Sequence, residues 1–209
     1  MSPDQAIDLI PPEAAPNAHR CATWALRWVG VLQEDLGQNR GRALNEILNA
    51  YRQIWGISPS SDLPWCAILA SVAWAMSENT YLWGRSLSEI APAISNRAFW
   101  AQTPLGAWIG AVYQMEQIGR IKNLWVDSRD LGLQPAERIT GALLCRERAG
   151  SGSDRARFIR SSYAGHVDIG IARLPSGRLL AVGGNLSDQV QIIERDPLDP
   201  RFRGALLLP

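Results

Sequence analysis

Apolar residues in the first part of the chain recur every three or four positions, which is the spacing of an amphipathic helix. This spacing predicts helices over residues 20–38 and 44–55, separated by a glycine-containing break at 37–41. Residues 1–18 contain four prolines and no sustained period, so we expect a flexible N-terminal arm there. The remainder, residues 19–209, is of a length that suits a single domain.

A different pattern begins at Pro64, where a loop is followed by the alanine-rich apolar run Trp65–Met76. We predict a helix that starts at this point and carries Cys66 in its first turn. The unpaired N–H groups and the macrodipole of a helix start favour negative charge, so a cysteine in this position can act as a nucleophilic thiolate. The alternative is that Cys66 is a small buried residue, as most free cysteines are.

The middle of the chain has weaker patterns. Residues 87–100 suggest short turns, and residues 104–118 suggest a helix that begins near a proline. We expect irregular structure over residues 119–137. A glycine- and serine-rich stretch, residues 149–154, is expected to be a surface loop.

The last third of the chain alternates apolar and polar residues, which is typical of strands. Val167, Ile169 and Ile171 share one face of the clearest strand, and a turn follows at residues 174–177. The predicted strands are 142–145, 166–173, 178–182 and 189–195. Helices followed by antiparallel strands indicate an α+β fold.

The hairpin around residues 174–177 determines which polar side chains face each other. With a two-residue loop, His166 stands opposite Asn185, and their Cβ atoms are roughly 4.5–5.5 Å apart. A three-residue loop with a glycine bulge shifts the register by one residue and separates the pair, unless the glycines before Asn185 hold a compensating bulge. Asp168, on the same face of the strand as His166, is then the alternative partner of the imidazole.

Composition narrows the class of protein. The chain has 209 residues and a net charge of +1, so nothing favours nucleic acid or an anionic membrane as a partner. No apolar run approaches the roughly 18 residues of a membrane span. The N-terminus lacks the pattern of a secretory signal. We therefore expect synthesis in the cytoplasm without a signal peptide, and release by lysis or specialised secretion if the protein leaves the cell.

Cysteine, histidine and tryptophan usage add three further points. The three cysteines are too few and too widely spaced for a disulfide framework, and with two histidines in the chain we expect no metal or other cofactor. Nine tryptophans are many for this length, and most should lie in the core, with a minority lining a groove for a sugar or peptide. Several of them fall in or after the predicted Cys66 helix: Trp65, Trp83, Trp100, Trp108 and Trp125.

Cys66, His166 and Asn185 occur in the order helix, strand, strand, which a papain-like thiol hydrolase requires. In such chemistry the thiolate attacks an amide carbonyl, His166 protonates the leaving amine, and Asn185 orients the imidazole. N–H groups at the helix start stabilise the oxyanion, and water then hydrolyses the thioester with His166 as base. The structural alternatives are an ordinary strand histidine and a turn asparagine.

The same residues carry a resemblance to a known family. Pro64–Ala67 leading a helix, Gly165–Val167 on a strand and Gly183–Val190 resemble the CHAP family, the cysteine, histidine-dependent amidohydrolases/peptidases, and papain-like cell-wall hydrolases more broadly. Val31–Gly41 is similar to the segment that these proteins often place before the catalytic helix. The likeness covers most of residues 20–195.

The resemblance implies a papain-like α+β fold, in which N-terminal helices, with the catalytic cysteine at a helix start, pack on a small antiparallel sheet. It also implies cleavage of amide bonds in peptidoglycan, as an amidase or endopeptidase, with Cys66 as nucleophile, His166 as base and Asn185 as orienting residue. The chain departs from many relatives at its first strand, where Gly141 is followed by Ala142 instead of aspartate.

Further residues are candidates for contact with the substrate. Glu34, Asn39, Trp65 and Asp168 lie in or near the matching segments, although a helix end and its loop explain Glu34 and Asn39 equally well. Residues 85–140 are expected to form a helical insert that caps or reshapes the groove. An inhibitor or delivery partner is left open.

Two alternative hypotheses belong to other functional classes. The first is a catalytically silent module that holds glycan or peptide in a tryptophan-lined groove. The second is a cysteine peptidase that acts on a protein substrate as a secreted effector. Fast alkylation of Cys66 near pH 6 separates an active nucleophile from an ordinary thiol, which is almost fully protonated at that pH.

Overall fold

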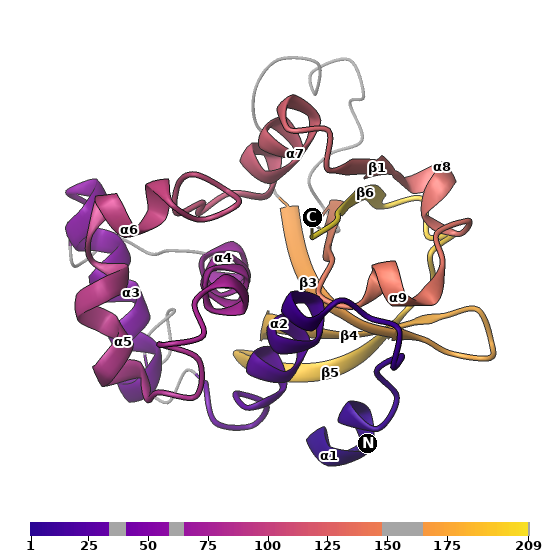
Figure 1. Ribbon diagram of the computed structural model, residues 1–209, viewed down its shortest axis with the longest axis horizontal. Helices are drawn as coiled ribbons and strands as arrows, with labels where there is room; N and C mark the ends of the chain where they lie inside the picture. Colours follow the sequence, from indigo (N-terminus) through magenta and orange to yellow (C-terminus); the bar gives the residue numbers. More distant parts are fainter. Residues whose placement is uncertain (34–40, 59–64, 148–164, 209) are drawn as a thin grey trace.

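The computed structural model describes residues 1–33, 41–58, 65–147 and 165–208, which form helices and one antiparallel sheet (Figure 1). The helices are α1 (Pro3–Ile7), α2 (Pro16–Leu26), α3 (Arg42–Trp55), α4 (Trp65–Glu78), α5 (Leu87–Ile94), α6 (Arg97–Ala101), α7 (Val112–Ile121), α8 (Ser128–Leu131) and α9 (Ala136–Ile139). The strands are β1 (Trp125–Asp127), β2 (Leu143–Glu147), β3 (Gly165–Arg173), β4 (Leu179–Leu186), β5 (Gln189–Arg195) and β6 (Phe202–Leu206). The chain is therefore an α+β protein, as the sequence predicts. Among the described helices, none is long and apolar enough to cross a membrane.

Helix α4 lies at the centre of the molecule, between α3, α5 and α6 on one side and the strands on the other (Figure 1). Every residue from Trp65 to Ser77 is buried, because a helix that is apolar on all sides must be covered on all sides. The few polar groups have partners inside the protein. The Trp74 indole N–H donates to the carbonyl of Gly141 at 2.7 Å, and the Ser71 hydroxyl donates to the carbonyl of Ile109 at 2.9 Å.

The sheet has the strand order β1-β6-β2-β3-β4-β5. Alternation along the strands separates two clusters of buried side chains. Val167, Ile169 and Ile171 of β3 belong to the main cluster, which includes the residues of α4. Leu144 of β2 and Ala181 of β4 belong to a second, smaller cluster with α8, α9 and β6. The core therefore occupies both faces of the sheet.

The hairpin between β3 and β4 has both a three-residue loop and a compensating bulge. Its loop is the three-residue type, residues 175–177, with Gly177 at a φ of 82°, so the two-residue loop is wrong. The resulting one-residue shift is corrected by an extra residue, Ile171, in β3 rather than by the glycines of β4. Asp168 consequently pairs with Gly183, as the two-residue loop would also have required.

Two glycines of β4 give the neighbouring elements room to approach. A Cβ atom at Gly183 would collide with Oδ1 of Asp168. A Cβ atom at Gly184 would lie 2.8 Å from the Trp65 ring and 2.9 Å from Leu69. The Asp168 carboxylate and the start of α4 can therefore approach β4 closely only because β4 has no side chains at these two positions.

The N-terminal third differs from the sequence prediction. Residues 1–18, expected as a flexible arm, contain α1, and both Ala6 and Ile10 are buried. Ser2 and Gln5 form a capping box that starts this helix. The helix expected over residues 20–38 starts earlier and ends at Leu26.

The chain leaves α2 because it joins the sheet. The Gly30 N–H donates to the carbonyl of Val190 at 3.2 Å, and the Val190 N–H donates to the carbonyl of Leu32 at 2.9 Å. A helix continuing through these residues would use the same backbone groups internally. The second predicted helix, 44–55, is confirmed as α3, and the Cys66 helix is confirmed as α4.

The middle of the chain is also more regular than predicted. Residues 87–100 form most of α5 and α6, not short turns, because Ser86 with Glu89 and Asn96 cap the helix starts. The helix expected from residue 104 begins at Val112. Within the expected insert 85–140, β1 pairs with β6 at the edge of the sheet, so this segment is not purely helical. The predicted loop 149–154 lies outside the described residues.

We predict that Gly184→Ala destabilises the protein by about 1–3 kcal/mol, because a methyl group there must displace Trp65 and Leu69 from a packed core. The free energy of unfolding from urea titration measures this. Gly132→Ala is the matched control, since its Cβ would meet nothing within 4 Å and its φ is −62°. An equal loss in both variants would contradict the close approach of α4 to β4.

Candidate active site

Cys66 lies in the first turn of α4, which begins at Trp65. It is 2% exposed. The first N–H groups of a helix have no partner within the helix and carry its partial positive charge. The sulfur is therefore attached to a backbone that favours an anion, as the sequence analysis expects of a nucleophilic cysteine.

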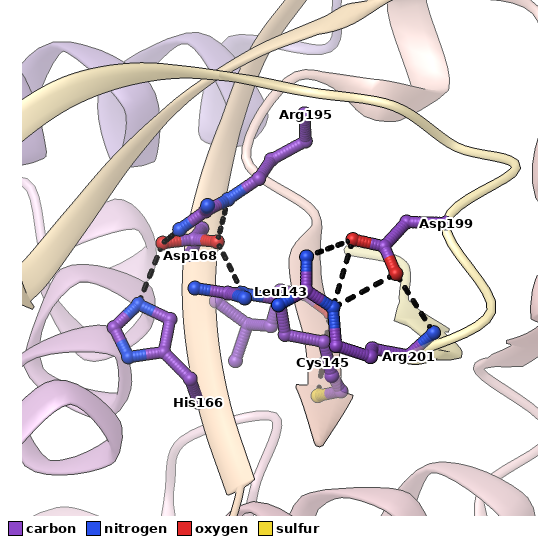
Figure 2. Close-up of polar contacts among 8 residues, drawn as sticks. Leu143, Cys145, His166, Asp168, Arg195, Asp199 and Arg201 are labelled. Carbon is purple, nitrogen blue, oxygen red and sulfur yellow. Dashed lines mark hydrogen bonds and ion pairs between the residues drawn. The ribbon is translucent and has the colours of Figure 1, made fainter. Parts of the chain in front are cut away.

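His166, near the start of β3, connects Cys66 to a carboxylate. Its Nε2 atom lies 2.8 Å from Oδ1 of Asp168 (Figure 2). Cys66 is close enough to the same imidazole to raise its pKa. Because Asp168 occupies Nε2, Nδ1 is the ring nitrogen available to the sulfur. The three side chains thus form a chain of polar contacts, and His166 is only 3% exposed.

Asp168 lies at the centre of a group of basic side chains. Its carboxylate has no exposed surface, and it accepts hydrogen bonds from Arg195 at 2.7 Å (Nε) and 3.1 Å (Nη2) (Figure 2). Arg146 of β2 lies 3.7 Å from the same carboxylate. A buried carboxylate needs such partners, because an isolated one would be too costly to desolvate.

These contacts set the charges of the imidazole and the carboxylate. Burial by itself lowers the pKa of His166, but the charge and hydrogen bond of Asp168, together with Cys66, outweigh burial and raise this pKa to about 9. Burial by itself raises the pKa of Asp168, but His166 and Arg195 hold it well below its usual range. At neutral pH the site therefore contains an imidazolium hydrogen-bonded to a carboxylate.

Arg146 adds to the positive charge around Asp168. It is the cross-strand neighbour of His166 in the pairing of β2 with β3. Burial and the nearby charge of Arg195 lower its pKa. Its buried Nε atom has no hydrogen-bond partner within the described part of the chain. Two arginines and an imidazolium thus surround one buried carboxylate, which favours negative charge at the neighbouring sulfur.

The structure brings together some of the predicted site residues. Cys66, His166 and Asp168 meet, and Asp168 is the imidazole partner that the sequence analysis gives as the alternative. The pairing of β3 with β4 ends at Asp168 and Gly183. Asn185 lies two residues further, with a φ of 60°. Its role in orienting the imidazole stays a prediction.

The other candidates for substrate contact fall differently. Trp65 is fully buried and packs against Gly184 of β4, so its indole offers no surface to a substrate in this structure. Asp168 is engaged by the imidazole and Arg195 and likewise has no exposed surface. Glu34 and Asn39 lie outside the described residues.

Sequence reasoning missed the two arginines. Arg195 was assigned to a strand but not to the site, and Arg146 follows directly after the predicted strand 142–145. A signal for both existed in Asp168, which lies between Val167 and Ile169, because a buried carboxylate requires a cation nearby. That signal indicates that a cation is needed but not which one.

The remaining cysteines are unlike Cys66. Cys21 and Cys145 have no exposed surface, and burial raises the pKa of each thiol well above its ordinary value. Neither forms a disulfide. Across the ranges that the structure describes, no three His, Cys, Asp or Glu side chains are grouped as a metal ion would need.

We predict that Asp168→Asn lowers the pKa of His166 well below about 9, because burial is then opposed by Cys66 but no longer by the carboxylate. NMR titration of the imidazole measures this. The variant should also lose about 3–5 kcal/mol of stability, since Arg195 becomes an unpaired, mostly buried charge. Asp199→Asn removes a carboxylate that binds Arg201 and is the matched control (Figure 2). A His166 pKa that stays near 9 in Asp168→Asn would refute the assignment.

No protein-family model, curated protein or solved structure matches this chain. The function is therefore inferred from the contacts of Cys66, His166 and Asp168 and from the motifs of the sequence.

Proposed function

We propose that this protein is a thiol-dependent hydrolase that cleaves amide bonds of peptidoglycan, as an amidase or endopeptidase. The observation that carries the proposal is the grouping of Cys66 at a helix start with His166, whose pKa it raises, and the buried Asp168, which is hydrogen-bonded to His166. A nucleophile, a base and a group that orients the base are the parts that acyl transfer to a cysteine requires.

The first half of the reaction forms an acyl-enzyme. The Cys66 thiolate attacks the carbonyl carbon of the amide, and the carbonyl oxygen becomes an oxyanion. N–H groups in the first turn of a helix are suited to stabilise this charge. His166, protonated in its resting state, gives its proton to the amide nitrogen, so that the C–N bond breaks and a neutral amine leaves.

The second half returns the enzyme to its starting state. The now neutral imidazole of His166 takes a proton from water, and the hydroxide attacks the thioester carbonyl. The C–S bond breaks, a carboxylic acid leaves, and the Cys66 thiolate and the imidazolium are restored. Protons and charge therefore balance over one cycle without a cofactor.

Asp168 and Arg195 act through the imidazole. Asp168 fixes the ring by its contact with Nε2, which leaves Nδ1 for the sulfur and the leaving group. Arg195 keeps the carboxylate ionised and in place. We assign Asn185 as a further orienting residue, on the resemblance of Gly183–Val190 to the CHAP pattern.

The papain-like fold and the peptidoglycan substrate belong to the same proposal. In support of the fold, a cysteine at the start of a central helix faces a histidine on an antiparallel sheet, in the chain order of papain-like enzymes. In support of the substrate, the segments around Cys66, His166 and Asn185 resemble cell-wall hydrolases of the CHAP family.

The wild type should release soluble fragments from purified peptidoglycan, and mass spectrometry of the fragments then identifies the bond. We expect Cys66→Ala and His166→Ala to abolish release, since each removes a reacting group. Asp168→Asn and Asn185→Ala should lower kcat by roughly 10- to 10⁴-fold, because an orienting residue is lost while the nucleophile remains.

Asp199→Asn again serves as the control and should retain full activity. Release by Cys66→Ala would refute the mechanism. No release by a wild type whose Cys66 also alkylates slowly would favour the silent binding module, and cleavage of protein but not of peptidoglycan would favour the peptidase.

We further predict that iodoacetamide modifies a single thiol rapidly at pH 6, that of Cys66. An adjacent imidazolium keeps the sulfur ionised, and since the pKa of His166 is about 9 the rate should change little between pH 6 and pH 8. Peptide mapping after short exposure measures the site and the rate. Cys21 and Cys145 are internal controls, because burial raises the pKa of both thiols well above its ordinary value. Rapid labelling that persists in Cys66→Ala would contradict this prediction.

A further inference from the structure

A pocket of about 170 Å³ lies between the end of α3, the helix α6 and residues 106–108. An engineered apolar cavity of about 150 Å³ accommodates one benzene ring, so this volume suits one ring or a small apolar substituent. The residues that shape it are Ile54, Trp55, Arg97, Trp100, Ala107 and Trp108. They are unrelated to the contacts of Asp168, and the catalytic steps above do not use them.

The inner wall of the pocket is rigid and apolar. The rings of Trp100 and Trp108 stack with centroids 4.6 Å apart and an angle of 17° between planes. Their N–H groups are already used, by the carbonyl of Ile94 at 2.7 Å and the carbonyl of Ile68 at 3.1 Å. A ligand in the pocket therefore meets indole carbon surface there and no free indole donor.

The mouth of the pocket has a different character. The indole of Trp55 is 47% exposed, and the guanidinium of Arg97 lies over it, 5.8 Å from the ring centroid. Nε and Nη2 of Arg97 are held by the carbonyl of Ile54 at 3.1 and 2.6 Å. Nη1 has no partner within the ranges that the structure describes, which leaves a fixed donor at the rim.

The pocket is connected to the helix that carries the nucleophile. Trp108 lines the pocket, and its N–H group binds the carbonyl of Ile68, two residues after Cys66 in the first turn of α4. One indole ring therefore separates the pocket from that turn. The pocket lies on the α3 and α6 side of α4, whereas the sheet lies on the other side (Figure 1).

We propose that this pocket binds an N-acetylated hexosamine ring of the substrate, an inference that rests on the proposed action on peptidoglycan. The C–H face of the sugar packs on the exposed indole of Trp55, as C–H groups do on the negative face of an aromatic ring. The acetyl methyl group enters the apolar pocket against Trp108, and the acetyl oxygen accepts from Nη1 of Arg97. The lining contains no carboxylate, so a cationic group is not favoured.

Calorimetry of the Cys66→Ala protein with a soluble trimer of N-acetylglucosamine tests this proposal without catalysis. We expect binding, and we expect Trp55→Ala in the same background to weaken it by roughly tenfold or more, which corresponds to about 1.4 kcal/mol. Arg97→Lys should weaken it as well, because the ammonium group does not reproduce the fixed guanidinium donor. Thermal unfolding checks that the variants keep their fold.

Tyr81→Ala is the matched control, since Tyr81 is an exposed aromatic residue with Arg85 over its ring at 5.2 Å but is not part of the pocket. It should bind the trimer like the parent. No binding, or equal binding by Trp55→Ala and the parent, would overturn the proposal. Binding of a sugar-free stem peptide that depends on Trp55 would also overturn it and would assign the pocket to peptide.

Two outcomes distinguish failure of the sugar pocket from failure of the hydrolase. If the wild type hydrolyses peptidoglycan and Trp55→Ala does so with the same kcat/KM, the hydrolase stands and the sugar pocket fails. If the trimer binds through Trp55 but no peptidoglycan is cleaved, the sugar pocket stands and the hydrolase fails.

Discussion

A carboxylate with no exposed surface stays ionised only if cations surround it, and the candidate active site is built around one such group. Asp168 is held between His166 on its own strand and Arg195 on β5, with Gly183 of β4 leaving the space that the carboxylate fills. The ionisation of Asp168 therefore depends on the relative positions of β3, β4 and β5. A change that moved any of these strands would also change the protonation of the imidazole.

The nucleophile is carried by a helix, whereas the charged cluster is carried by strands. Helix α4 is covered all round, by α2 and α3 and by β3 and β4. Its first turn is fixed by the close approach to Gly184 and by the Trp108 N–H group at Ile68. The sulfur is thus positioned by packing, and the imidazole is positioned by charge. Trp108, in the wall of the aromatic pocket, thus contributes to the packing that positions the sulfur.

The sequence predicted what depends on local patterns. The central helix with Cys66 in its first turn, the strand with His166 and Asp168, and the α+β class all follow from periodicity and composition. The α1 and α5 helices were not predicted, although Ser2 and Ser86 start capping boxes that are visible in the sequence. The early end of α2 could not be predicted, because its cause is pairing with Val190, over 150 residues away in the chain.

Local patterns in the sequence could not predict the contact between Arg195 and Asp168, because strand register does not place the two residues side by side. By strand register Arg195 lies opposite Leu179, which lies opposite Arg173, five residues from Asp168. Sheets twist from strand to strand, and the long guanidinium side chain reaches back across β4 to the carboxylate (Figure 2). Twist accumulates over several strands, so no pairwise pattern in the sequence records it.

The extra residue at Ile171 constrains how the length of the hairpin between β3 and β4 can change. A strand presents alternate residues to alternate faces, so what matters to the site is whether the number of residues between turn and site is odd or even. The three-residue turn and the bulge each change that parity once, and together they cancel. Turn and bulge should therefore be gained or lost as a pair: a shorter hairpin loop is compatible with the same site when the bulge is absent, and incompatible with it when the bulge remains.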